Sequence, residues 1–318
     1  MTNVNLDPKG ASEVSVIITC YNDSSAFKRC LASVIEQTVP AKEIIVVDDC
    51  SDDSQQLEEI IKQSGADNVT YLRNSENKNG AYSRNRGMSS ASGAFIGLLD
   101  GDDYWALNHI EESLKAIKEK KADFIYSNVI EVDVSGNKKT RYTTDVASLN
   151  NKNDVLFFSP PQTNSFFFKR AVFSKVKFDE TLRRHQDYQF LISCINEGTI
   201  EVKYNNMATT YYCESHRPGA GRMNFHSMFS FWNAHAAKFS HDLLNAFLKL
   251  QIHTCLVLKK GEGIDEYFST YPILKNKDLY NSTYIRLLRL LGYRNQISRS
   301  ILYLAYHVLD GKLRVIKK

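Results

Sequence analysis

The sequence predicts an α/β protein in which a mostly parallel sheet is flanked by helices and followed by a helical C-terminal extension. From residue 13 to residue 100, apolar β-branched runs of strand length alternate with segments of helical periodicity, and the connections between them are short. This alternation is typical of parallel strands joined by helical crossovers. After residue 224 the helical periodicity continues without strand-like runs, which predicts the extension.

The expected strands are apolar runs that close on polar residues, at 13–22, 42–53, 68–74 and 94–100. Helices are expected between them, at 25–38, 54–65 and 80–92. The first of these helices carries apolar residues at helical spacing, namely Phe27, Leu31, Val34 and Ile35. Ser54 is expected to cap the second helix, and Gly65 is expected to end it.

Composition excludes several classes of protein. The 318 residues are 43% hydrophobic and 24% charged, which is typical of a globular chain, and a net charge of +4 gives no bulk argument for nucleic-acid binding. The six cysteines contain no C-x-x-C pair, which argues against a structural zinc site. Neither a signal peptide nor an apolar run of about 18 residues is apparent, so we expect a cytoplasmic protein.

Polar clusters follow three of the predicted strands: "TCYN", "DDCSDD" and "DGDD". Each cluster alone is also compatible with ordinary turn and cap residues. Because the carboxyl ends of parallel strands meet at one edge of the sheet, a single site is expected to gather Thr19, Asp48, Asp49, Asp100 and Asp102. Glycine-rich phosphate loops are missing from the sequence, so a divalent cation on Asp100-x-Asp102 is expected to neutralise a nucleotide diphosphate.

Four segments, in this order, resemble the inverting glycosyltransferases of family 2, which have the GT-A fold and use nucleotide-diphosphate sugars. They are "VSVIITCYN", "QTVPAKEIIVVDDCSDDS", "NGAYSRNRGMSSASGAFIGLLDGDDYW" and "RRHQDYQFL". The resemblance covers residues 13–216 and implies a catalytic domain at 1–223, with a helical region at 224–318 for membrane association, acceptor binding or oligomerisation.

The resemblance also implies roles on the donor side. Asp49 matches the carboxylate that reads a pyrimidine N3–H, and Arg84 matches an arginine that holds the nucleotide. Asp100 matches the aspartate that faces the ribose, and Asp102 matches the direct ligand of Mn²⁺ or Mg²⁺. The first-strand loop lies along the base and ribose through Thr19, Tyr21 and Asn22.

On the acceptor side, Asp187 resembles the general base, at the start of a helix whose apolar residues pack in the core. The family usually has glutamate where this chain has Gln186. His216 resembles a histidine that meets the metal or the diphosphate, with Arg217 and Arg222 as phosphate neighbours. Contacts to the acceptor are expected from Asn164 and Ser165, whereas Asp103 is expected to brace its loop and Trp105 to pack.

The C-terminal segment is basic and amphipathic. It has an apolar stripe of Ile297, Ile301, Leu304 and Val308, and a single acid, Asp310, stands against eight basic residues: Arg286, Arg289, Arg294, Arg299, Lys312, Arg314, Lys317 and Lys318. Such helices bind anionic membranes, which would make the protein peripheral on the inner face of the cytoplasmic membrane. A helix packed on its own domain and an interface between subunits are the alternatives.

The resulting expectation is a metal-dependent inverting transferase that moves a sugar from a UDP-linked donor to a hydroxyl of a growing glycan or lipid-linked acceptor, in lipopolysaccharide or capsule biosynthesis. The alternatives are a nucleotidyltransferase acting on a sugar phosphate and a non-catalytic protein that binds nucleotide sugars. A nucleotidyltransferase favours a glycine-rich, lysine-bearing first loop, and "TCYNDSS" is not one. A non-catalytic protein has no need of Asp102 and Asp187.

Overall fold

The computed structural model describes residues 13–214, 224–259, 261–293 and 295–309. The chain divides into two compact units. Unit 1 comprises Met1–Ser148 and Pro160–Arg217, and unit 2 comprises Leu149–Ser159 and Pro218–Lys318. The short segment 149–159 therefore leaves unit 1 and joins the C-terminal helices, a connection that the sequence analysis missed.

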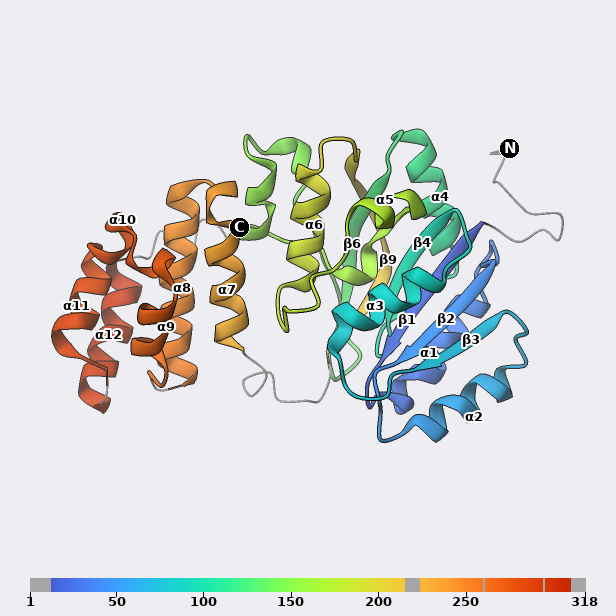
Figure 1. The fold of residues 1–318 in the computed structure, drawn as a ribbon, viewed down its shortest axis with the longest axis horizontal. Helices are drawn as coiled ribbons and strands as arrows, with labels where there is room; N and C mark the ends of the chain where they lie inside the picture. The colour runs from blue at the N-terminus through green and yellow to red at the C-terminus, as the bar shows by residue number, and fades with distance from the viewer. Residues whose placement is uncertain (1–12, 215–223, 260, 294, 310–318) are drawn as a thin grey trace. The chain divides into compact units, whose positions relative to one another are not determined.

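Unit 1 is built on one mixed sheet whose main path runs in the order β3-β2-β1-β4-β8-β6-β9-β5, with β7 paired to β6 (Figure 1). The first four strands in sequence pair in parallel, as predicted. Antiparallel pairs are added by β5, β7 and β8. The strands are β1 (Val14–Cys20), β2 (Glu43–Asp48), β3 (Val69–Arg73), β4 (Phe95–Asp100), β5 (Tyr104–Trp105), β6 (Phe124–Val132), β7 (Lys138–Arg141), β8 (Phe167–Lys169) and β9 (Val202–Cys213).

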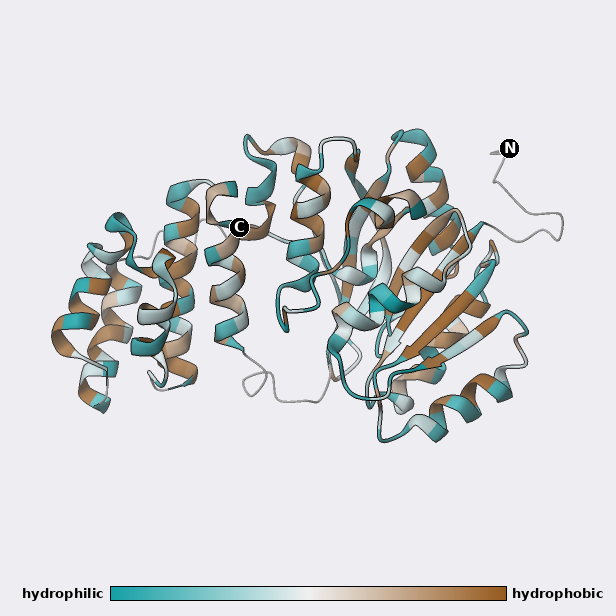
Figure 2. Ribbon diagram, viewed as in Figure 1, coloured by the Kyte–Doolittle hydropathy of each residue, from teal (hydrophilic) through white to brown (hydrophobic). Residues whose placement is uncertain are grey.

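Helices cover both faces of this sheet because successive side chains of each strand point to opposite sides. Val16 and Ile18 pack with Phe27 and Leu31 of α1, whereas Ile17 faces α3. Figure 2 shows the resulting apolar strands beneath amphipathic helices. The helices of unit 1 are α1 (Ser24–Ile35), α2 (Ser54–Ser64), α3 (Asn79–Ser90), α4 (His109–Glu119), α5 (Arg170–Lys175) and α6 (Gln186–Asn196).

Gly87 lets α3 lie close to the sheet. A Cβ at this position would stand 2.4 Å from Cγ2 of Ile17 and 3.1 Å from Cγ2 of Val47. Both neighbours are buried and branched at Cβ, so they cannot swing aside. The close approach of α3 brings Arg84, three residues earlier, to the carboxyl edge of the sheet.

The start of α2 differs from the prediction. Asp53, not Ser54, is the N-cap residue, although Asp53 makes no capping bond and its Oδ2 accepts from the backbone N–H of Ser24 instead. Ser54 is the first helical residue and donates its hydroxyl to Asp48. The expected stop at Gly65 is confirmed, since this residue closes the helix in the left-handed conformation with φ of 67°.

Unit 2 is helical, and its core combines aromatic residues with leucines and isoleucines. Trp232 stacks on Phe157 with ring centroids 5.3 Å apart, and the backbone N–H of Ser240 donates to Asp154 at 2.9 Å. These contacts fix the segment 149–159 to the C-terminal helices. The helices are η2 (Lys152–Phe157), α7 (Phe225–His235), α8 (His241–Leu258), α9 (Ile264–Thr270), α10 (Lys277–Tyr280), α11 (Thr283–Leu291) and α12 (Gln296–Leu309).

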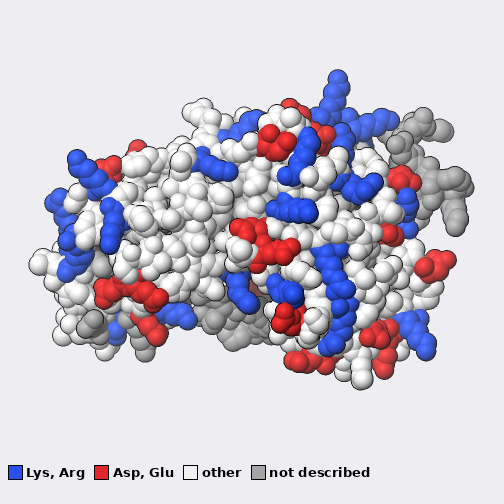
Figure 3. All heavy atoms as spheres, in the orientation of Figure 1, with Lys and Arg blue, Asp and Glu red and all other residues white. Residues whose placement is uncertain are grey.

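The apolar stripe predicted on the last helix faces outward. Ile297, Ile301, Leu304 and Val308 are 73%, 44%, 64% and 80% exposed, while α12 packs through its opposite side on α8 and α11. Figure 3 shows Lys and Arg side chains over α10 and α11 on the face drawn. Among the helices that the structure describes, none has the length and apolar character needed to cross a membrane.

Candidate active site

Asp100 is the centre of the polar cluster at the carboxyl edge of the sheet. It ends β4 directly beside Thr19 of β1, whose hydroxyl donates to Oδ1 of Asp100 at 2.9 Å. Arg84 of α3 forms an ion pair with the same oxygen at 2.6 Å, and its side chain is only 11% exposed. Three predicted site residues, from three separate segments, are therefore brought together.

Asp103 supports this cluster from inside the protein. It is 1% exposed, and its carboxylate accepts from the backbone N–H of Cys213 at 2.7 Å and from the side chain of Asn164. Burial, together with the charges of Asp102 and Asp100, raises its pKa well above the usual range. The expected bracing role is confirmed, and Trp105 is confirmed as a packing residue at 2% exposure.

Asn164 and Ser165 require a correction. Both were expected to contact the acceptor, but they are 1% and 2% exposed. The side-chain Oδ1 of Asn164 accepts from the backbone N–H of Asp100 at 2.9 Å, and Ser165 donates to the carbonyl of Gln162 at 2.8 Å. The side chains of these two residues therefore make hydrogen bonds inside the protein and do not present polar groups to a ligand in this structure.

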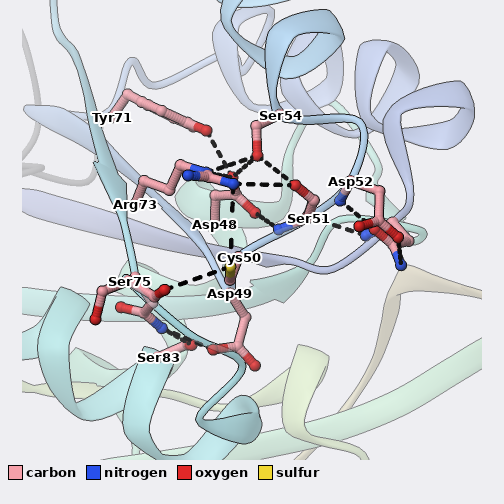
Figure 4. A network of polar contacts seen from close by, with 12 residues as sticks. Asp48, Asp49, Cys50, Ser51, Asp52, Ser54, Tyr71, Arg73, Ser75 and Ser83 are labelled. Carbon is pink, nitrogen blue, oxygen red and sulfur yellow. Dashed lines mark hydrogen bonds and ion pairs between the residues drawn. The ribbon is translucent and has the colours of Figure 1, made fainter.

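Asp49 anchors the loop before α3. Its Oδ1 accepts from Asn74 at 2.7 Å and from the backbone N–H of Lys78 at 2.9 Å, and its Oδ2 accepts from the backbone N–H of Asn79 at 2.8 Å. A carboxylate has about four acceptor positions, so one remains for a further donor such as a base N–H. Figure 4 shows Asp49 pointing away from the neighbouring Asp48 network.

Asp48 has a structural role, which corrects its expected place in the site. It is fully buried and accepts from Ser51 at 2.8 Å, from Ser54 at 2.5 Å and from Tyr71 at 2.7 Å (Figure 4). Burial alone would raise the pKa of Asp48, but these hydrogen bonds lower it below the usual value. The network ties the β2 loop to α2 and β3.

The loop that follows β1 is hydrogen-bonded to the loop that follows β2. Asn22 has a positive φ of 55°, donates its backbone N–H to Ser51 and accepts from the backbone N–H of Asp52 at 2.7 Å. Tyr21, beside it, is 42% exposed. Asn22 thus fixes the loop, and Tyr21 next to it lies at the protein surface.

Asp187 lines a cavity of about 360 Å³ that Arg84 and Asp100 also line. It occupies the first turn of α6. Burial raises the pKa of Asp187 above the usual value, although a backbone hydrogen bond from Tyr188 and the charge of Arg84 oppose the shift. The predicted donor-side and acceptor-side carboxylates therefore face one shared space.

Gln186 links the two sides. Its Oε1 accepts from Arg84 at 3.2 Å, and its Nε2 donates to Oδ1 of Asn79 at 3.1 Å. Through Asn79 and Arg84 the amide connects Asp49 to Asp100 by a continuous series of hydrogen bonds. Asn79 was missed by sequence reasoning, although the Asn79-Gly80 dipeptide is a signal for the left-handed backbone found there, with φ of 73°.

A divalent cation fits the chemistry of the strand-end residues. Oδ2 of Asp100 has no hydrogen-bond partner among the described residues, and Asp102 follows two positions later. Two carboxylates are enough for Mg²⁺ when phosphate oxygens and water complete the shell. In the part of the chain that the structure describes, no group of three or more His, Cys, Asp or Glu residues is arranged to hold a metal ion. His216, Arg217 and Arg222 lie outside the described residues.

Comparison with known proteins finds glycosyltransferases, both as a family and as individual relatives. The family described as "Glycosyl transferase family 2" matches residues 15–182. The "Amylovoran biosynthesis glycosyltransferase AmsB" of Erwinia amylovora is 29% identical over 306 residues, which are 88% of this chain and 97% of that protein. The "UDP-Glc:alpha-D-GlcNAc-diphosphoundecaprenol beta-1,3-glucosyltransferase WfaP" of Escherichia coli is 28% identical over 214 residues, 63% of this chain and 76% of that protein.

Among solved structures, that of S. aureus TarS 1-349 in complex with UDP aligns with a TM-score of 0.56. The alignment covers 96% of this chain and 90% of that one, at 18% sequence identity. At this identity the likeness shows the fold alone: a GT-A fold with a C-terminal helical region.

Proposed function

The chain belongs to glycosyltransferase family 2, and from that premise we propose that it transfers a sugar from a nucleotide-diphosphate sugar to an acceptor hydroxyl in one inverting displacement. The observation that carries this proposal is the shared cavity. Asp187, Arg84 and Asp100 all line it, so a candidate base and a candidate nucleotide-holding group share one space.

Asp187 is the proposed base. An inverting displacement needs one group that takes the proton of the acceptor hydroxyl on the face opposite the leaving diphosphate. Burial raises the pKa of Asp187, which brings its basicity closer to that needed near neutral pH. The position at the start of α6 fixes the carboxylate on a helix rather than on a loop.

On the donor side, Asp49 is proposed to read the base through its remaining acceptor position, and Thr19, Tyr21 and Asn22 to flank the nucleoside. Asp100, which is paired with Arg84, is proposed to face the ribose. Asp102 with Oδ2 of Asp100, and with His216, would hold Mn²⁺ or Mg²⁺, which when bound supplies positive charge to the departing diphosphate.

We propose a UDP-linked donor and an acceptor in bacterial surface-polysaccharide assembly. Support comes from the name of WfaP, which specifies UDP-Glc and a diphosphoundecaprenol acceptor, from AmsB, which is named for amylovoran biosynthesis, and from the UDP complex of TarS. Arg217 and Arg222 remain proposed neighbours of the diphosphate.

Residues 1–223 are proposed as the catalytic domain and 224–318 as a region that brings it to an anionic membrane. The exposed stripe on α12 supports this proposal. Helices α11 and α12 contain three arginines, Arg286, Arg289 and Arg299, and no Asp or Glu, so basic and apolar groups share the same pair of helices. Packing of the stripe against the described residues is disfavoured by its exposure.

The proposed reaction is tested by incubating the protein with a panel of nucleotide sugars, Mn²⁺ and a polysaccharide-repeat acceptor. Release of nucleoside diphosphate that depends on the acceptor is the expected result. Release of pyrophosphate would instead identify a nucleotidyltransferase, and release of no product with any donor would contradict the proposal.

A further inference from the structure

The loop before β8 reaches the cavity beside Asp187, but not through the two residues expected to contact a substrate. Asn164 and Ser165 are enclosed, whereas Gln162 and Thr163 line the cavity of about 360 Å³. Thr163 is itself buried, while Gln162 is half-buried. Gln162 is therefore the residue of this loop that is best placed to meet a substrate.

The backbone of Gln162 is held in place at the start of the short helix η3 (Thr163–Ser165). Its carbonyl oxygen accepts from the backbone N–H of Ser165 at 3.0 Å and from the Ser165 hydroxyl at 2.8 Å. The Gln162 side chain therefore starts from a well-defined point beside the cavity.

Arg141, at the end of β7, holds the far end of the same side chain. The Gln162 amide oxygen accepts from Nη1 of Arg141 at 3.0 Å and from Nη2 at 2.8 Å. A guanidinium group has only donors, so the amide has to present its oxygen to Arg141 rather than its nitrogen. An ion pair of 3.4 Å with Glu131 restrains the guanidinium in turn. Two bonds from one planar group leave the amide little freedom to rotate.

The amide nitrogen of Gln162, which carries two N–H donors, lies on the other side of the group from the bonded oxygen. Tyr188 and Tyr212 also line this cavity. Burial raises the pKa of both tyrosines, and the charge of Arg141 opposes both shifts, so the guanidinium lies near them. Because Tyr188 directly follows Asp187, the pair of Arg141 and Gln162 belongs to the part of the cavity close to the proposed base.

We propose, building on the function above, that Gln162 is a specificity-determining residue whose amide N–H donates a hydrogen bond to an oxygen of a sugar in this cavity. Arg141 is the positioning residue that orients the amide. A site that donates to one oxygen discriminates against a ligand that lacks an acceptor there, so the pair selects sugars by the position of a hydroxyl or carbonyl oxygen. The sugar can be the one transferred or the one that accepts it.

The test measures steady-state transfer by the full chain with Mn²⁺. The donors are UDP-glucose, UDP-galactose and UDP-N-acetylglucosamine, the acceptors are the p-nitrophenyl glycosides of the same three sugars, and the kinetics are measured on the fastest pair. Gln162→Glu keeps an oxygen for Arg141 but has no N–H to donate when it is ionised, so it should lower kcat/KM about tenfold. The neutral variant Gln162→Met should lose about the same factor.

The two Michaelis constants identify the sugar that Gln162 contacts. A higher KM for the donor assigns the hydrogen bond to the transferred sugar, and a higher KM for the acceptor assigns it to the acceptor. Arg141→Met should lower kcat/KM about threefold, because the amide keeps its donors but loses its restraint, and Arg141→Lys should lose less.

A matched control, Gln63→Glu, makes the same change at an exposed glutamine of α2 and should leave the kinetics unchanged. The dissociation constant of UDP should change less than about twofold in every variant, because neither Gln162 nor Arg141 is proposed to contact the nucleotide.

Wild-type kinetics in Gln162→Glu would overturn the inference, because Gln162 would then serve only to hold Arg141. A loss of UDP binding as large as the loss of transfer would also overturn it, since the substitution would have disturbed the whole site. Absence of transfer by the wild type with every pair would count against the proposed function, whereas transfer that Gln162→Met leaves unchanged would refute only this inference.

Discussion

The ion pair between Arg84 and Asp100 should be an energetic as well as a geometric link between α3 and the strand-end site. We expect a double-mutant cycle with Arg84→Met and Asp100→Asn to give a coupling free energy of about 1.5–2 kcal/mol in unfolding. The pair is 2.6 Å long, and its side chains are 11% and 30% exposed. It is therefore less screened than a surface pair, which contributes about 0.2–1 kcal/mol, but it is not fully desolvated.

The measurement is urea unfolding of the wild type, the two single variants and the double variant under the same salt and pH. Lys78 and Glu76 form an exposed pair of 3.3 Å, with side chains 37% and 72% exposed, and they provide a control cycle whose coupling should be close to zero. In addition, Arg84→Met should weaken UDP binding about tenfold, since Asp100 loses its strongest restraint. Coupling below about 0.5 kcal/mol for Arg84 and Asp100 would refute this reasoning.

Three further outcomes are expected. Gly87→Ala should lower the free energy of unfolding by about 1–3 kcal/mol, because its methyl group would overlap Ile17; an unchanged urea midpoint would contradict this. The pKa of Asp187 is raised, and a general base acts only when it is ionised. Therefore kcat/KM should fall as the pH drops through a value above the usual aspartate range. A pH–rate profile that stays flat down to about pH 4 would exclude Asp187 as a base with a raised pKa. The full chain should sediment with anionic liposomes at low salt, and Leu304→Ser/Val308→Ser should sediment less; equal sedimentation would assign the stripe to another partner.

The sequence predicted the elements that depend on local pattern and the residues that the strand order gathers. Thr19 and Asp100 could be expected to meet because their strands end at the same edge, and the structure pairs them. Burial was harder to predict. Asp48 and Asn164 have the same residue types as site residues, but only the packed fold shows that they are enclosed and hydrogen-bonded internally.

Contacts between segments that are distant in the sequence also could not be predicted from the local sequence pattern. The segment 149–159 reads as a polar loop followed by aromatics, and its attachment to the C-terminal helices depends on Phe157 meeting Trp232. The link from Gln186 to Asn79 spans 107 positions and has no periodic signal. Such contacts follow from the tertiary fold rather than from propensity.

The most direct test of the proposed mechanism is the comparison of sugar transfer and UDP affinity in Asp187→Asn. This substitution keeps the shape of the side chain and removes its ability to accept a proton, while the donor-side bonds of Asp100, Thr19 and Arg84 are untouched. The mechanism predicts that transfer falls by at least about a hundredfold, whereas the dissociation constant of UDP changes less than about twofold. Transfer near the wild-type rate, or a loss of UDP binding equal to the loss of transfer, would contradict Asp187 as the base.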